Sequence, residues 1–415
     1  MKKLICMLLA AIMLLSMAAC GQQSAAESSA PQETEAVVQQ TEAATEPEET
    51  EAGPRTVTVT DMSGDEVTIE GEIESIVNLW PAGTSSFFVM GAGDMISALA
   101  VNNAGTMNGW TKFFYPESVN IPALGGTEPS IEDIVNLDPD LVIIHPMSSA
   151  SGFAQQIRDL GIPAININFS DYASMTQAYT LLGEILGGEY QEKLNNWCAE
   201  VNAKIEKNRS LTADLAEEEK PVVYYIAGQS DSLTTTMGIS GASNIMQDWI
   251  ESNGGRFASA VLNLEGSEVT AEEIFELDPD IIIVGGVYQH DLIERLNTTD
   301  GWKDLSAVKN GRVYGNPYAC FNWDRFGMES LLQIDFALLC IQPEIAAENG
   351  IDADAIVEEI KTFYATYNGA ELTDEQANNM LGGLLPDGTI EEPAAGGQGG
   401  GNGGGQGNGQ GGGKG

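Results

Sequence analysis

The chain has 415 residues, a formal net charge of −43 and only two histidines. Its length allows two folded domains, because one domain typically takes about 100–200 residues. The excess of 61 acidic over 18 basic residues argues against a nucleic-acid partner, because phosphate binding needs a basic surface. Acidity of this kind favours solubility and says little about the fold.

The first residues, MKKLICMLLAAIMLLSMAAC, have the plan of an export signal. Two lysines precede an apolar stretch that is short for a membrane span, and small residues follow it. The ending MAAC resembles a bacterial lipobox, in which Cys20 becomes the lipidated first residue, although Met17 stands where that motif usually has leucine. An ordinary signal peptide with an incidental cysteine is the alternative. A diacylated Cys20 would hold the protein at the outer face of a membrane.

Both ends of the mature chain are predicted to lie outside its folded part. Residues 21–54 are rich in glutamate and show no apolar periodicity, which is typical of a disordered acidic tether. Residues 369–415 are predicted to be a tail, Gly-rich and disordered from residue 396. Such ends favour a Gram-positive surface over a periplasm. The remaining cysteines are predicted to be small buried hydrophobes rather than a disulfide framework: Cys198, Cys320 and Cys340.

Residues 55–171 predict a first α/β lobe. Alternating Val and Thr on both sides of Ser63-Gly64-Asp65 indicate a β-hairpin. Further strands and helices follow in chain order: a strand at 73–81, a helix at 83–93, a strand at 95–101, a helix at 130–137, a strand at 141–145, and a helix then a strand within 151–168. The continuous apolar run at 141–145 is typical of a parallel sheet that is covered on both faces.

A helical connector separates this lobe from a second one. Apolar residues keep helical spacing through residues 172–218, interrupted only by Gly187-Gly188, which predicts one long connecting helix or two helices end to end. Residues 219–368 then repeat the α/β plan. The predicted elements of this lobe are a strand at 221–227, a helix at 243–255, a helix and strand within 270–286, and a turn with a short strand at 302–316.

One sequence unit occurs in both lobes. SIEDIVNLDPDLVIIHP begins at Ser130, and the near-copy TAEEIFELDPDIIIVGG begins at Thr270. In each copy a short helix ends at Asp-Pro-Asp, because proline cannot continue a helix, and a buried strand follows. The predicted fold is therefore α/β, with two Rossmann-like lobes of parallel sheet, a long connecting α-helix, and a ligand cleft between the lobes.

The order of these segments resembles a known family, the extracytoplasmic substrate-binding proteins of ABC importers for iron complexes and cobalamin. The resemblance covers about residues 56–345 and is carried by segments quoted as they stand: VTVTDMSGDEVTIEGEIESIVNLWP, SIEDIVNLDPDLVII, LLGEILGGEYQEKL, VTAEEIFELDPDIIIV and WKDLSAVKNGRVY. It implies a monomeric protein without an intrinsic cofactor that captures an iron chelate, haem or a corrinoid. It also implies delivery to a permease dimer and its ATPase.

The resemblance further implies a docking role for one surface glutamate on each lobe. In the family, this glutamate lies in the helix before Pro-Asp, seven residues ahead of the proline, and meets arginines of the membrane subunits. That rule selects Glu132 and Glu272, although Glu273 lies beside the second. The alternative is that both are acidic residues of a first helical turn, which the helix dipole favours.

Candidate ligand contacts follow the predicted strands, where open α/β sheets bind their ligands. Aromatic loops with few charges suit a large, flat or apolar chelate better than a sugar or a free phosphate. Arg325 can bind a ligand carboxylate or pair with Asp324. The full candidate set is Trp80, Trp110, His145, Met147, Met237, Tyr288, His290, Trp323 and Arg325.

The two histidines each follow the repeated strand, one per lobe. His145 and His290 can ligate a metal through the bound chelate, or can be ordinary polar residues bonded to loop backbone. Met147 and Met237 can serve as soft ligands, but such residues more often line a wall. No metal site is assigned with certainty.

Two other functional classes compete with the importer hypothesis. A cell-surface receptor or scavenger can use the same fold without a permease. An exported hydrolase is disfavoured, because the chain lacks GxSxG, HExxH and P-loop motifs and has few histidines for base catalysis.

Overall fold

The computed structural model describes residues 55–100, 108–124, 129–145, 152–239 and 244–392. The predicted signal peptide, Cys20, the tether, Met147 and the Gly-rich end lie outside these residues. The fold is of the α/β class, with one hairpin and two separate parallel sheets. Within the part of the chain that is described, no helix is both long and apolar enough to cross a membrane.

A β-hairpin opens the described chain. β1 (Thr56–Thr60) pairs antiparallel with β2 (Glu66–Glu70), and Gly64 in the turn has a φ of +89°, a conformation that glycine adopts without strain. Asp61 is buried in the turn and accepts bonds from the backbone nitrogens of Ser63 (2.9 Å) and Asp65 (3.0 Å). The turn predicted from the sequence is therefore confirmed.

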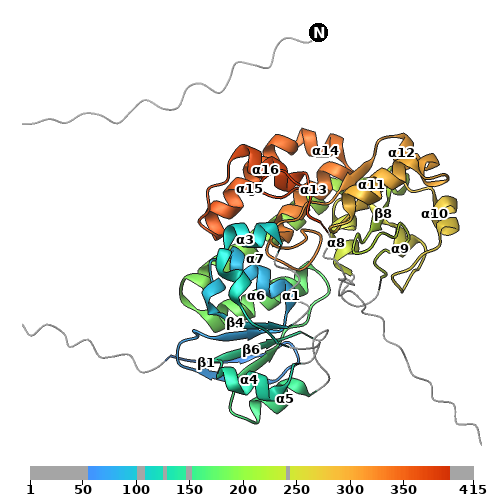
Figure 1. Cartoon of the computed structure of the whole chain (residues 1–415). Coiled ribbons are helices and arrows are strands. Elements are labelled where there is room, and N and C mark those ends of the chain that lie inside the picture. The colour runs from blue at the N-terminus through green and yellow to red at the C-terminus, as the bar shows by residue number, and fades with distance from the viewer. Residues whose placement is uncertain (1–54, 101–107, 125–128, 146–151, 240–243, 393–415) are drawn as a thin grey trace, which may run out of the picture. The chain divides into compact units, whose positions relative to one another are not determined.

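The N-terminal sheet has five parallel strands in the order β5-β4-β3-β6-β7. Helices α4 and α5 pack on one face through Ile134, Phe153 and Ile157, and α1, α6 and α7 lie on the other (Figure 1). The strands are β3 (Ile76–Asn78), β4 (Ile96–Ala100), β5 (Ala123–Leu124), β6 (Leu141–Ile144) and β7 (Ala164–Asn166). The helical segments between them are α1 (Pro81–Val89), η1 (Gly93–Met95), α3 (Gly109–Phe114), η2 (Pro116–Asn120), α4 (Ile131–Leu137) and α5 (Phe153–Arg158).

The connector is a helical hairpin rather than one helix or two helices end to end. α6 (Tyr172–Leu186) and α7 (Gly188–Thr212) pack against each other, and the Cys198 thiol lies 3.3 Å from the Thr176 carbonyl oxygen. Gly187 and Gly188 have φ values of +69° and +52°, so the chain reverses direction there. Sequence periodicity is the same on both sides of such a turn, which is why it did not reveal the reversal.

The C-terminal sheet has four parallel strands in the order β11-β10-β8-β9. One face packs on α10, α11 and α12, and the other on α8 and α13. The strands are β8 (Val222–Ile226), β9 (Arg256–Phe257), β10 (Ile281–Val284) and β11 (Val313–Gly315). The helical segments are η4 (Glu217–Glu219), α8 (Asn244–Ser252), α9 (Ala258–Val261), α10 (Ala271–Leu277), α11 (Gln289–Thr298), η6 (Trp302–Asp304) and α12 (Ser306–Lys309).

Four helices complete the described chain after the second sheet. α13 is buried along nearly its whole length and contacts α7, α8 and α15. The segment predicted to be a tail from residue 369 includes α16, which packs on α15 through Ala377 and Met380. The helices are α13 (Ser330–Ile341), α14 (Pro343–Glu348), α15 (Ala353–Tyr367) and α16 (Asp374–Leu381).

The three cysteines that the structure describes are free and buried, as predicted: Cys198, Cys320 and Cys340.

Candidate ligand-binding site

Aromatic side chains gather at the carboxyl ends of the N-terminal sheet. Trp80 follows β3, His145 follows β6 and Phe169 follows β7. The ring of Phe169 lies 5.5 Å from that of Trp80 and 5.8 Å from that of His145. Parallel strands end at the same edge of a sheet, so three separate loops bring these side chains together.

A segment of the C-terminal lobe reaches the same place. Residues 316–329, here called the crossing segment, link β11 to α13. The ring of Phe326 lies 4.7 Å from Phe169, at 66° to it. The crossing segment therefore joins the carboxyl ends of both sheets.

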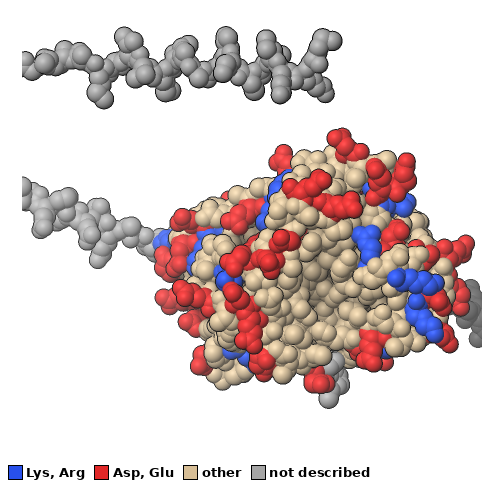
Figure 2. Space-filling view, turned by 90° about the horizontal axis from the view of Figure 1, so that it is seen from above, with Lys and Arg blue, Asp and Glu red and all other residues tan. Residues whose placement is uncertain are grey.

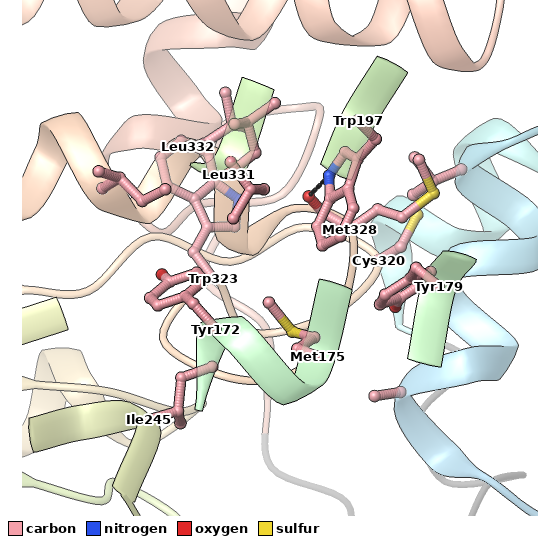
Figure 3. Packing of buried hydrophobic residues seen from close by; sticks show 14 of the residues in the cluster. Tyr172, Met175, Tyr179, Trp197, Ile245, Cys320, Trp323, Met328, Leu331 and Leu332 are labelled. Carbon is pink, nitrogen blue, oxygen red and sulfur yellow. Dashed lines mark hydrogen bonds between the residues drawn. The ribbon is translucent and has the colours of Figure 1, made fainter. Parts of the chain in front are cut away.

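Three hydrogen bonds tie the end of the crossing segment to helices of the first half, and a fourth ties the first residue of α13. Tyr179 Oη donates to the Phe326 carbonyl (3.0 Å), and Trp197 Nε1 donates to the Met328 carbonyl (2.8 Å; Figure 3). The Met328 nitrogen donates to Ser86 Oγ (3.2 Å), and Tyr172 Oη donates to the Ser330 carbonyl (3.1 Å). Because α1, α6 and α7 all contribute, the path of this segment is set by tertiary contacts.

Glu329, the last residue of the crossing segment, has a buried side chain that accepts hydrogen bonds from earlier residues of the same segment. Its side chain accepts from the backbone nitrogens of Cys320 (2.9 Å) and Phe321 (2.7 Å) and from the hydroxyl of Tyr364. Burial raises the pKa of Glu329 to about 7, although these hydrogen bonds oppose the rise. This residue was not among the sequence candidates, because nothing in its local pattern distinguishes a buried glutamate from an exposed one.

Arg325 pairs with Asp324 at the ends of β8 and β10. Their atoms Nε and Oδ1 lie 3.3 Å apart, an ion pair without hydrogen-bond geometry, and both side chains are buried. Arg325 also donates to the Ala227 carbonyl (3.1 Å), and Asp324 accepts from the hydroxyl of Tyr225. Burial raises the pKa of Asp324, and the attraction of the guanidinium opposes that rise. Of the two roles considered for Arg325, the structure contains the pairing with Asp324.

His145 is nearly inaccessible, with 4% of its surface exposed. Burial lowers its pKa to about 4, because an imidazolium would lose its hydration there. The ring is therefore neutral at neutral pH.

The other candidate residues are more scattered. Trp110 and Trp323 have no exposed surface, and Trp110 donates its indole N–H to the Leu384 carbonyl (2.8 Å). His290 Nε2 lies 3.0 Å from the Gly383 carbonyl oxygen, so this histidine contacts the C-terminal segment. Tyr288 and Met237 are half-buried against the core.

No metal centre emerges from these positions. Among the described residues, no group of three or more histidine, cysteine, aspartate or glutamate side chains is placed to hold a metal ion. The aromatic residues Phe169 and Phe326 were missed by the sequence analysis. Phe169 follows a strand as Trp80 does, and that position was the signal that could have identified it.

The repeated acidic residues lie on exposed helix surfaces. Glu132 and Glu272 are exposed in the first turns of α4 and α10. Glu273 instead forms a capping box, in which its carboxylate accepts from the Thr270 nitrogen (2.9 Å) and hydroxyl (2.7 Å). These bonds lower the pKa of Glu273 and engage one of its two carboxylate oxygens, Oε2.

Comparison with known proteins identifies the family. The periplasmic binding protein family matches residues 100–318. An uncharacterised ABC transporter substrate-binding lipoprotein of Bacillus subtilis is 27% identical over 62% of this chain and 77% of its own length. A cobalamin-binding protein of Halobacterium salinarum is 25% identical over 55% of this chain. The match covers only 58% of the length of that relative.

A solved structure supports the same fold. The periplasmic solute binding protein from Veillonella parvula superposes with a TM-score of 0.67, covering 80% of this chain and 99% of that one at 24% sequence identity. The chain belongs to the periplasmic binding protein family, whose members are substrate-binding proteins of ABC importers and not enzymes.

Proposed function

We propose that this chain is a lipid-anchored extracytoplasmic protein that binds a metal chelate or corrinoid between its two sheets and delivers it to an ABC permease. One observation supports this proposal most directly: aromatic residues from loops of both lobes lie in contact. Phe326 of the C-terminal lobe packs on Phe169 of the N-terminal lobe, next to Trp80. Large apolar ligands are bound by such aromatic surfaces. Cys20 is the proposed site of lipid attachment.

The charge at the strand ends supports a narrower class of ligand. In the described loops that follow the strands of both sheets, Arg325 is the one Lys or Arg residue, and its charge is balanced by Asp324 at 3.3 Å. His145 is neutral because burial lowers its pKa to about 4. The sequences of the remaining strand-end segments contain no Lys or Arg: VNNAGTM (101–107), GGTE (125–128), PMSSAS (146–151) and SGAS (240–243).

Desolvating a polyanion without a compensating cation is costly. We therefore propose a ligand with no net negative charge, such as a corrinoid or a hydroxamate chelate of iron, rather than a catecholate, citrate or haem complex. On the outer surface, Figure 2 shows Asp and Glu spread over one face, with Lys and Arg fewer and gathered mainly toward one side of it.

A fluorescence titration tests this proposal. The mature chain is titrated with cobinamide, cyanocobalamin and ferrioxamine B, and in parallel with ferric enterobactin, ferric citrate and haem. We expect saturable quenching with a Kd below about 1 μM for a ligand of the first group. A Trp80→Phe variant is the control, because it should remove much of the quenching if the ligand lies at the aromatic loops.

The outcomes separate two errors. Tight binding of anionic chelates alone would refute the charge argument and leave the chelate-binding function standing. If no member of either group binds, the chelate-binding function itself is wrong.

We further propose that Glu132 and Glu272 dock the protein to the permease. Glu272 is favoured over Glu273 because the carboxylate of Glu273 is bonded to Thr270. Charge pairs at an interface mainly set orientation and encounter rate. The receptor alternative, in which no permease takes part, predicts that these glutamates have no role in uptake.

The test compares two double variants. Glu132→Arg with Glu272→Arg should abolish ligand uptake by cells while leaving the Kd of the purified protein unchanged. Asn136→Arg with Glu276→Arg is the matched control, because these exposed residues lie four positions further along the same helices. Normal uptake by the first variant would exclude the docking role.

A further inference from the structure

The described chain does not end with the second lobe. After α16 it continues through residues 382–391, here called the C-terminal strap, which contacts helices of both lobes. The strap has a folded shape of its own, because the Leu385 nitrogen donates to the Thr389 carbonyl (2.8 Å) and the Gly388 nitrogen donates to the Leu385 carbonyl (2.9 Å).

The strap contacts the C-terminal lobe at the start of α11, the helix that follows β10. The Gly383 carbonyl oxygen lies 3.0 Å from His290 Nε2. Gly383 itself is buried against the Gln289 side chain, and a Cβ atom at this position would lie 2.7 Å from Gln289 Nε2. With a φ of +66° as well, position 383 accepts a side chain only with strain.

The next residues of the strap contact the N-terminal lobe at the start of α3, the helix that follows β4. Trp110 Nε1 donates to the Leu384 carbonyl (2.8 Å), and the Gly109 nitrogen donates to Glu391 Oε1 (3.1 Å). The Leu385 side chain covers Gly109 so closely that a Cβ atom there would lie 2.7 Å from it. Two consecutive carbonyls, of Gly383 and Leu384, thus bind opposite lobes.

We infer that the C-terminal strap is an intramolecular clasp that fastens the start of α3 to the start of α11. Both helices begin beyond the carboxyl ends of strands, the edge at which open α/β sheets bind ligands. The clasp therefore fixes the separation of the two lobes beside the proposed ligand site. For the lobes to part at this side, the clasp has to release at least one of them.

The size of the contact fits a releasable clasp. Three hydrogen bonds, the Leu385 side chain and the packing of Gly383 on Gln289 join the strap to α3 and α11, whereas α6, α7 and α13 are joined by a continuous buried core. Release would uncover Trp110, which now has no exposed surface. If the strap were a passive end of α16, its release would change neither lobe.

Hydrogen–deuterium exchange of the full mature chain tests the clasp without any ligand. Gly383→Val should break the strap contact for two reasons. The new side chain would clash with Gln289, and valine is strained at the φ of +66° that this position adopts. We expect exchange to become several-fold faster in residues 108–114 and also in residues 288–298. Gly382→Ala is the matched control, because its φ is −79° and a Cβ atom there makes only ordinary contacts.

A second pair of variants guards against misfolding of the first. Leu385→Asp removes the apolar contact with α3, and Ile390→Asp is its control, because Ile390 lies in the same strap with 51% of its surface exposed. Thermal unfolding checks that each variant remains folded. Faster exchange in both lobes with Leu385→Asp but not with Ile390→Asp supports the clasp. Unchanged exchange, or a change in one lobe alone, overturns it, whatever the ligand experiments show.

Discussion

The two copies of the Leu-Asp-Pro-Asp unit have the same backbone but different surroundings. Asp138 and Asp278 both end their helices in the left-handed conformation, with φ values of +47° and +44°. Asp140 and Asp280 both accept hydrogen bonds from backbone nitrogens at the start of a neighbouring strand: from Glu74 and Ser75 just before β3, and from Val222, the first residue of β8. The repeat is thus a structural joint that connects a surface helix to a central strand.

The differences begin where each strand ends. The first copy continues into His145, a buried side chain beside Phe169. The second continues into Gly285-Gly286, where the backbone approaches Gly228 so closely that a Cβ atom on Gly286 would lie 2.2 Å from the Gly228 oxygen. The first strand is thus followed by a buried imidazole, and the second by closely packed backbone. The shared part therefore builds the fold, and the divergent loops set the local chemistry.

The largest expected effect concerns His145 and pH. The pKa of His145 is about 4 in the folded chain against an ordinary value of 6.5, so between these pH values the unfolded state binds one proton more than the folded state. The free energy of unfolding therefore rises by about 3 kcal/mol as the pH increases from about 4 to about 6.5. Above about pH 6.5 this stabilisation by neutral His145 is fully present. His145→Gln should remove this dependence.

The measurement is urea unfolding of the parent and the variant at several pH values. Glu329 has the opposite effect on the free energy of unfolding. Its pKa is raised to about 7, so between pH 4.5 and 7 the folded state binds more protons than the unfolded state, and the free energy of unfolding falls as the pH rises. The difference between the two profiles isolates His145, since Glu329 is common to both. Parallel profiles would show that His145 is not the source of the dependence.

A middle-sized effect compares the last aspartate of each unit. Asp140 accepts two backbone hydrogen bonds, each of 2.9 Å, and Asp280 accepts one of 2.7 Å. We expect Asp140→Ala to lower the free energy of unfolding by about 2 kcal/mol and Asp280→Ala by about 1 kcal/mol. Urea denaturation at pH 7 measures both. The reverse order would mean that the bond count does not determine the strength of the joint.

The smallest effect compares the helix starts. Thr270 caps α10 by accepting from the Glu273 nitrogen (3.2 Å), whereas the Ser130 side chain makes no capping bond to α4. Thr270→Ala should cost about 1 kcal/mol of unfolding free energy and Ser130→Ala less than about 0.5 kcal/mol. Thermal unfolding of the two single variants gives the comparison. Equal costs would indicate that capping does not distinguish the copies.

Local patterns predicted much of the fold. The hairpin at Gly64, the continuous apolar strands and both Asp-Pro-Asp helix ends depend on neighbouring residues, so periodicity and turn chemistry were sufficient to find them. The reversal at Gly187-Gly188 was missed, because a glycine pair can interrupt a helix or turn the chain back. The contacts of the strap were missed because its partners, Trp110 and His290, lie far away in the sequence.

The candidate site was predicted less well than the fold. Position after a strand selected Trp80 and His145, which the structure places together around Phe169, and their contact with a ligand stays a prediction. Trp110, which was chosen as an aromatic residue of a loop, is fully buried and donates its indole N–H to the Leu384 carbonyl of the strap. Aromatic residues follow strands both in cores and at binding sites, so sequence position alone does not separate the two cases.

The sequence by itself determined the α/β class, the two parallel sheets and the duplicated joint, because these follow from apolar periodicity and from the conformational limits of proline and glycine. Only the tertiary structure decided which side chains share an environment. It paired Arg325 with Asp324, buried Glu329 beneath Tyr364, and placed the strap across α3 and α11. The physical reason is that desolvation and hydrogen bonding depend on neighbours in space, and those neighbours come from distant parts of the chain.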